Sequence, residues 1–167
     1  MTVRPEEPRD RPAVRRVNEA AFGRASEADL VDRLRARSAS YLGLVAEDGG
    51  EVAGHITFSP VRLDPPRPDL VAFGLAPMSV LPDRQRGGVG SALVRAGLAA
   101  CRAAGADVVF VLGHPDYYPR FGFRPAAEWD VADPYGAPPG AFMALELTPG
   151  ALGRAGGVAH YDPALDG

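Results

Sequence analysis

The sequence is poor in the residues that disulfide scaffolds and metal sites need. Cys101 is the only cysteine, so the chain forms no internal disulfide, and the helical pattern around it favours a buried thiol over a nucleophile. The three histidines, His55, His114 and His160, have no metal-ligand spacing among themselves or with Cys101. We therefore expect no metal site, and a reducing cytoplasm is the default location.

Long apolar runs and an excess of positive charge are also lacking. No segment approaches membrane-spanning length, and the N-terminus has no apolar signal core. With 18 basic and 21 acidic side chains the net charge is −3, which indicates no general attraction to nucleic acid. We predict neither a membrane nor a nucleic acid as partner. At 167 residues, 46% of them hydrophobic, the chain is long enough for one domain with its own core.

The sequence does contain a basic, glycine-rich turn between an apolar strand and a helix, within residues 78–93. Gly87, Gly88 and Gly90 remove the Cβ atoms that would keep a ligand away from the backbone. Successive N–H groups at the helix N-terminus can then point at an anion, and Arg84 and Arg86 add positive charge beside them. The pattern predicts a phosphate site, with a glycine turn that binds nothing as the alternative.

Two common phosphate-binding motifs do not match this turn. A P-loop requires a lysine after its glycines, and none follows here. A dinucleotide fingerprint requires Gly-x-Gly-x-x-Gly, whereas Gly88-Val89-Gly90 is followed by Ser91, Ala92 and Leu93. A nucleotide-binding protein is therefore the weakest functional hypothesis for this loop.

Two stretches resemble motifs of the GCN5-related N-acetyltransferase (GNAT) family. Gln85-Arg86-Gly87-Gly88-Val89-Gly90 is similar to its Gln/Arg-x-x-Gly-x-Gly/Ala pyrophosphate loop, and Tyr118 to Phe123 resembles its Tyr-x-x-x-Gly-Phe turn. Pro77, within the apolar strand upstream, marks a bulge or an edge, because proline cannot donate to a strand ladder. Pro119 departs from the family's more helical sequence, so we expect a single late turn there.

The resemblance implies an α/β (α+β) fold with a mixed, mostly antiparallel central sheet, helices on both faces and a bulged fourth strand. It covers residues 1–147 as the acetyltransferase domain and leaves residues 148–167 as a C-terminal extension of unassigned role. The residue pattern itself predicts a hairpin over residues 41–60, with the turn at Asp48-Gly49-Gly50, and an interior strand over residues 107–112. A terminal hairpin is expected to pair residues 128–135 with residues 141–147.

The resemblance also implies an activity, the transfer of an acetyl group from acetyl-CoA, the co-substrate, to a primary amine. Tyr118 would be the general acid, and the backbone N–H of Met78 would stabilise the thioester carbonyl. The residues that would bind acetyl-CoA are Met78, Val80, Gln85, Arg86, Gly87, Gly88, Val89, Gly90 and Ser91. The acceptor is a small molecule or a peptide, and a homodimer is left open. The alternative function is a non-catalytic acyl-CoA-binding or sensing module.

The general base remains open at this point. His55, His114, Asp116 and Glu27 are candidates, and a chain of waters to a distant carboxylate is equally consistent with the sequence. His55 is either a base that reaches a cleft or a hydrogen-bonded structural histidine. Four acidic residues near the first two helices either hold a cationic amine or are solvated: Glu19, Glu27, Asp29 and Asp32.

Overall fold

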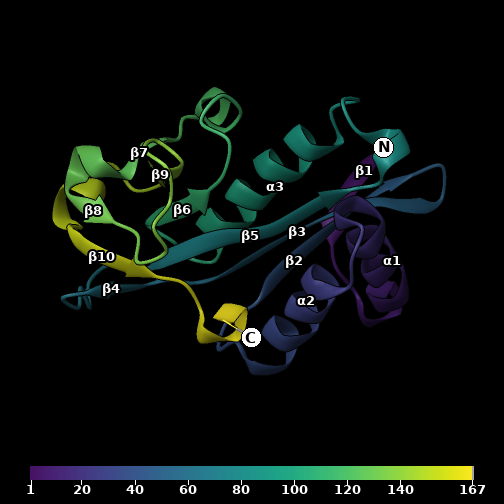
Figure 1. The fold of residues 1–167 in the computed structure, drawn as a ribbon, viewed down its shortest axis with the longest axis horizontal. Coiled ribbons are helices and arrows are strands. Elements are labelled where there is room, and N and C mark those ends of the chain that lie inside the picture. The colour runs from purple at the N-terminus through teal and green to yellow at the C-terminus, as the bar shows by residue number, and fades with distance from the viewer. Residues whose placement is uncertain (167) are drawn as a thin grey trace.

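A computed structural model describes residues 1–166 of the chain. One seven-stranded sheet forms the middle layer, with α3 on one face and α1 and α2 on the other (Figure 1). The helices are α1 (Arg11–Phe22), α2 (Ser26–Arg37) and α3 (Val89–Ala103). The strands are β1 (Thr2–Pro5), β2 (Leu42–Asp48), β3 (Glu51–Pro60), β4 (Arg62–Asp64), β5 (Ala72–Val80), β6 (Val108–Leu112), β7 (Arg124–Pro125), β8 (Val131–Ala132), β9 (Phe142–Glu146) and β10 (Gly157–His160).

The large sheet has the strand order β1-β2-β3-β5-β6-β9-β7. Only β5 and β6 run parallel within it, which confirms the predicted mixed, mostly antiparallel sheet. The predicted hairpin of β2 and β3 is also confirmed. The bulged strand is β5, fifth rather than fourth in the chain because the short β4 precedes it. The register between β3 and β5 shifts between Ile56 and Phe58, opposite Pro77.

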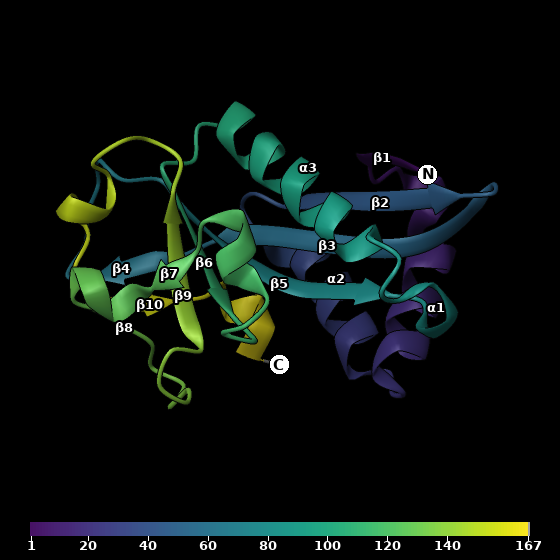
Figure 2. The ribbon, with the colours of Figure 1, turned by 90° about the horizontal axis from the view of Figure 1, so that it is seen from above.

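Strands β5 and β6 separate partway along their length. Their pairing begins at Ala72 and Val108 and ends at Leu75 and Val111, while β5 continues to Val80 alongside β3 alone. Figure 2 shows β5 extending beyond the end of β6 beneath the start of α3. A gap between two neighbouring strands leaves backbone N–H and C=O groups unpaired on their facing edges, where an extended ligand can bind them.

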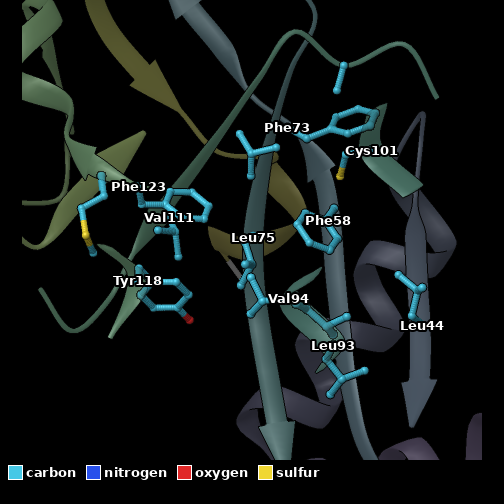
Figure 3. Close-up of a cluster of buried hydrophobic side chains, with 14 of the residues drawn as sticks. Leu44, Phe58, Phe73, Leu75, Leu93, Val94, Cys101, Val111, Tyr118 and Phe123 are labelled. Atoms are coloured by element: carbon cyan, nitrogen blue, oxygen red, sulfur yellow. The ribbon is translucent and has the colours of Figure 1, made fainter. Parts of the chain in front are cut away.

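The main core lies between the sheet and α3. Phe58, Leu75, Leu93 and Val94 are buried there, and the ring of Tyr118 enters the same cluster with its hydroxyl oxygen at the outer edge (Figure 3). Small residues along α3 allow the helix to approach the strands closely. Gly97 is the tightest contact, since a Cβ on it would lie 2.4 Å from the Phe58 ring.

We expect the Gly97→Ala substitution to destabilise the fold, although alanine is the better helix former. The helix preference contributes about 1 kcal/mol in favour of alanine. Overpacking against Phe58 costs about 1–3 kcal/mol, so the net loss should reach ~1–2 kcal/mol in the free energy of unfolding. Urea denaturation followed by circular dichroism measures it. Gly153→Ala is the control, because a Cβ there meets open space, and its stability should equal or exceed that of the parent.

The structure corrects the predicted terminal hairpin. β9 pairs with β6 and β7, whereas β8 pairs with β10, so β8 and β9 are not partners. The reason is local, since the strand ends before Pro134, which has no N–H to donate. In addition, the carboxylate of Asp133 accepts hydrogen bonds from the amides of Tyr135 and Ala137, which removes both amides from a ladder.

Residues 148–166 pack onto the rest of the chain. β10 forms a second, three-stranded sheet with β4 and β8, and Leu152 and Ala159 are buried in a second core against β6 and β9. The last turn, Pro163–Asp166, lies on α2, where Arg33 donates a hydrogen bond to the carbonyl of Ala164 at 3.1 Å (Figure 1). The division of the chain after residue 147 stays a prediction, but this segment is part of the packed structure.

Candidate active site

A cleft of about 970 Å³ lies where β5 and β6 separate. It extends from the glycine-rich turn at the start of α3 to the short 3₁₀ turn Tyr118–Phe121 that follows β6. The two motifs found in the sequence therefore line one continuous cavity. The residues that line it are Ala21, Phe22, Met78, Ser79, Val80, Gln85, Arg86, Gly88, Gly90, Ser91, His114, Tyr117, Tyr118 and Arg120.

The glycine-rich turn presents free backbone amides to this cleft. Arg86 and Gly88 both have positive φ, 64° and 89°, a conformation that turns the chain sharply into α3. The first hydrogen bond of the helix runs from Ala92 N to Gly88 O at 3.0 Å, so the preceding amides of the first turn have no partner in the helix. Within residues 1–166, no amide from position 85 to 91 donates to a backbone carbonyl. This is the arrangement that binds anions.

The free edge of β5 contributes a second set of backbone groups. The amide of Leu81 donates to a carbonyl of β3 at 2.8 Å, and successive residues of a strand direct their N–H and C=O groups to opposite edges. Met78 and Val80 therefore direct theirs away from β3, into the gap that β6 has left. The carbonyl of Val80 accepts a hydrogen bond there from the Gln85 side chain at 3.1 Å. The amide of Met78 faces the cleft beside Tyr118.

Tyr118 lies at the other end of the cleft with its ring buried. Its side chain is 8% exposed and packs edge-on against Phe123, at 5.7 Å between ring centroids. Burial, with a smaller effect from neighbouring Tyr117, raises the pKa of the Tyr118 phenol to about 12. The hydroxyl thus keeps its proton at neutral pH and can donate it. The predicted single late turn at Pro119 is confirmed, since Tyr118–Phe121 is one 3₁₀ turn.

Tyr117 and Arg120 are cleft residues that the sequence patterns did not identify. The hydroxyl of Tyr117 lies 3.3 Å from Ser91 Oγ, so it joins the turn after β6 to the start of α3. The guanidinium of Arg120 stacks over the Tyr117 ring at 4.5 Å from the centroid and donates to its carbonyl at 2.9 Å. Tyr117 lies just before the Tyr118 motif and Arg120 occupies one of its unspecified positions, but an adjacent Tyr-Tyr pair after a buried strand is a signal that could have suggested a shared role.

The candidate bases separate clearly in space. Among the residues described, His114 is the one of the four that lines the cleft. Glu27 pairs with Arg24, and Asp116 is not part of the lining. His55 is fully buried on the α1 side of the sheet, where its ring nitrogens contact polar side chains, as the structural alternative predicted.

The acidic residues of the first two helices are paired with arginines of the chain. Arg15 forms ion pairs with Glu19, Asp29 and Asp32, each at 2.9 Å. None of these carboxylates is among the cleft residues of the described chain, 1–166. Ion pairs with arginine on exposed helix faces explain these carboxylates, so no acceptor amine is needed to explain them.

Two further searches covered residues 1–166. No group of three or more His, Cys, Asp or Glu side chains is arranged to hold a metal ion in this part of the chain. No helix within it is long and apolar enough to cross a membrane. Cys101 is a buried residue of α3, and burial raises the pKa of its thiol to about 12.

Sequence and structure comparisons identify relatives along nearly the whole chain. The acetyltransferase (GNAT) domain profile matches residues 2–126. The Escherichia coli N-acetyltransferase YhbS is 37% identical over 163 residues, which are 96% of each chain. The E. coli N-acetyltransferase YjhQ is 42% identical over 118 residues, 68% of this chain and 64% of YjhQ.

Solved structures extend the likeness to the fold. The structure of E. coli YhbS in complex with CoA superposes with a TM-score of 0.91, at 32% identity over 99% of this chain and 92% of that one. A GNAT family acetyltransferase from Brucella melitensis, in complex with acetyl-CoA, superposes with a TM-score of 0.79, at 38% identity over 99% of this chain and 97% of that one. Together with a cleft that joins both family motifs, these matches show that the chain belongs to the GNAT family and is an acetyltransferase that uses acetyl-CoA.

Proposed function

We propose that the protein transfers the acetyl group to a primary amine and that two parts of the cleft bind acetyl-CoA. The amides around Gly88 and Gly90, with Arg86 beside them, bind the pyrophosphate of acetyl-CoA. The free edge of β5 binds the pantetheine arm, with the Val80 groups along it and the Met78 N–H on the thioester carbonyl. The supporting observation is that one cavity connects the anion-binding turn to Tyr118 past the unpaired edge of β5.

Acetyl transfer requires one proton to leave the amine and another to reach the departing sulfur. A primary amine with a reference pKa near 10.4 is mostly protonated at neutral pH and must lose a proton before it attacks. Its nitrogen then forms the C–N bond as the C–S bond breaks, and the Met78 N–H stabilises the negative charge that develops on the oxygen. The departing thiolate receives the proton of Tyr118, which is recovered from solvent. Because the pKa of Tyr118 lies above that of the thiol, much of its role is hydrogen bonding to the sulfur.

The direct experiment measures thiol release from acetyl-CoA with four amine probes: spermidine, tyramine, kanamycin and a hexapeptide with a free N-terminus. We expect at least one probe to increase thiol release above hydrolysis, with an acetylated product in the mass spectrum. CoA should also raise the melting temperature, because a ligand that binds only the folded state stabilises it by mass action. Stabilisation by CoA without acetylation of any amine would favour the non-catalytic binding module.

The compartment and the class of acceptor are part of the same proposal. A single buried cysteine fits a reducing cytoplasm, where thiols persist without disulfide pairing. The acceptor enters beside Phe22, at the end of α1, which is 40% exposed and lines the cleft. An apolar side chain at the entrance favours an amine that carries apolar groups near the reacting nitrogen.

A further inference from the structure

Buried polar side chains line the face of the sheet that α1 covers. Asn18 of α1 donates to the carbonyl of Val14 at 3.0 Å and contacts His55 of β3, which places the imidazole on this face. Ser79 of β5 is the cross-strand partner of His55, so the two side chains project from the same face about 5 Å apart. Ser59 lies four residues beyond His55 on β3 and shares the face by strand alternation.

Side-chain oxygens on this face have no hydrogen-bond partner in residues 1–166. Of the buried side-chain polar atoms in residues 1–166, Asn18 Oδ1, Ser59 Oγ and Ser79 Oγ accept and donate no hydrogen bond. These side chains are at most 3% exposed. Buried polar groups in folded proteins are nearly always satisfied, and ordered water provides the partner where the protein does not. Two of these oxygens, on Asn18 and Ser79, flank one imidazole.

The contacts of His55 fix how it can exchange protons. Its Nε2 lies 3.0 Å from Glu6 Oε1 and 3.5 Å from the Tyr41 hydroxyl, while Nδ1 lies 3.4 Å from Asn18 Nδ2. The short contact to a carboxylate requires a proton on Nε2, so the neutral ring has its lone pair on Nδ1. The long contact from Asn18, at 3.4 Å, leaves that lone pair only weakly engaged.

Charged side chains lie close to the imidazole, on its Nε2 side. Burial opposes the charge on Glu6, but hydrogen bonds from His55 and Arg35 outweigh it and lower the pKa of the carboxyl to about 2. Glu6 thus stays ionised, and Arg35 of α2 balances it at 2.7 Å. Burial and the Glu6 charge raise the pKa of Tyr41, which remains neutral. Within the described chain, Asn18 is the α1 residue that contacts the imidazole, and Ser79 is the β5 residue that pairs with His55 across the two strands.

This row of buried polar side chains reaches the active site at Ser79, which lines the cleft next to Met78 and Val80. At the other end of this row of side chains, Glu6 and Tyr41 line a separate groove of about 300 Å³ that shares no lining residue with the cleft. A proton that enters at Ser79 therefore has an exit to solvent at Glu6, without crossing the apolar core under α3.

We propose that Ser79, Asn18 and His55 form a proton-transfer track that takes the proton from the acceptor ammonium. The N–H bond of the ammonium breaks, a water held between Ser79 Oγ and Asn18 Oδ1 receives that proton, and the water gives one of its own to His55 Nδ1. The imidazolium is stabilised by Glu6 and returns a proton to solvent through the groove beside Tyr41. These three residues act on the amine through the water, so they are positioning residues. The inference rests on the proposed acetyl transfer to an amine.

The test compares Ser79→Ala with Ser59→Ala in the thiol-release assay, with the most active of the four amine probes. Both substitutions remove one buried, unpartnered hydroxyl from the same face, but only Ser79 lines the cleft. We expect Ser79→Ala to lower kcat at pH 7 at least ~10-fold. This loss is smaller than the full effect of removing a general base, because water in the cleft remains an alternative proton acceptor. Ser59→Ala should change kcat less than ~2-fold.

The pH profile separates a proton role from a structural one. As pH approaches the amine pKa near 10.4, the free amine is already present and no acceptor is needed, so the Ser79→Ala deficit should shrink. His55→Gln should show the same convergence. A deficit that is constant with pH, or an equal loss in Ser59→Ala, overturns the track while the acetyl transfer stands. No thiol release with any probe in the parent protein overturns the acetyl transfer itself, and the track with it.

A crystal structure with CoA bound provides a readout that does not depend on activity. We expect an ordered water hydrogen-bonded to both Ser79 Oγ and Asn18 Oδ1, beside His55 Nδ1, and its loss in Ser79→Ala. A direct contact between the two side chains with no room for water would overturn the track, even if the variant were slow.

Discussion

The Tyr118→Phe variant should bind acetyl-CoA normally and turn it over ~10²- to 10⁴-fold more slowly, the range that general acid catalysis supplies. The substitution removes only the phenol oxygen, which lies at the outer edge of the core cluster (Figure 3). The ring remains packed against Phe123, so the fold and the shape of the cleft are retained. Because the role proposed for the hydroxyl is on the departing sulfur, we expect its loss to affect kcat rather than the dissociation constant of acetyl-CoA.

Stopped assays of thiol release, together with calorimetric titration of CoA, separate the two quantities. Tyr135→Phe is the matched control, since it removes the same atom from a tyrosine that is 46% exposed and does not line the cleft. The pKa of Tyr118, raised to about 12 by burial, also predicts that the parent enzyme keeps its activity up to pH 10, with no loss from phenol ionisation. Normal turnover in Tyr118→Phe would show that the general-acid assignment is wrong.

The sequence predicted the parts of the site that depend on neighbouring residues. The glycine-rich turn and the Tyr118 turn are each encoded within about ten residues, and both lie where the strand pattern placed them. Their approach in space was also expected, because the carboxyl ends of parallel strands meet at one edge of a sheet. The missing N–H of Pro77 predicted a bulge or an edge, and the register of β3 and β5 shows that it is a bulge.

The remaining features depend on pairing between distant segments. The separation of β5 and β6 after Leu75 is a property of strand register, which no local pattern encodes. The row of polar residues facing α1 was visible only as alternation along β3, and its extension to Ser79 requires the β3 and β5 register. The terminal hairpin was mispredicted for a local reason, the early end of β8 before Pro134, and for a distant one, since the partner of β8 is β10, some 25 residues further along the chain.

In the proposed binding mode, a side chain at Gly90 would obstruct acetyl-CoA. A Cβ on Gly90 would meet the Tyr117 hydroxyl at 3.1 Å and Met78 Cε at 3.7 Å, between the start of α3 and the turn after β6. The branched side chain of valine would occupy the cleft between them and displace the pyrophosphate from the amides of the helix N-terminus. Hydrogen bonds to a charged group contribute about 1.5–3 kcal/mol each, so the loss of one or two corresponds to ~100-fold in affinity.

Gly90→Val should therefore weaken CoA binding ~100-fold without destabilising the unliganded protein, because valine is a better helix residue than glycine in the first turn of α3. Calorimetric titration with CoA and the melting temperature without CoA measure the two effects. Gly87→Val provides the contrast, since a Cβ there meets only the carbonyl of Arg84 at an ordinary 3.5 Å and φ is not positive. Its affinity should fall less than ~5-fold, about 1 kcal/mol. Equal losses at the two positions would mean that the turn fails through its backbone conformation, and that the space between Tyr117 and Met78 is not where CoA binds.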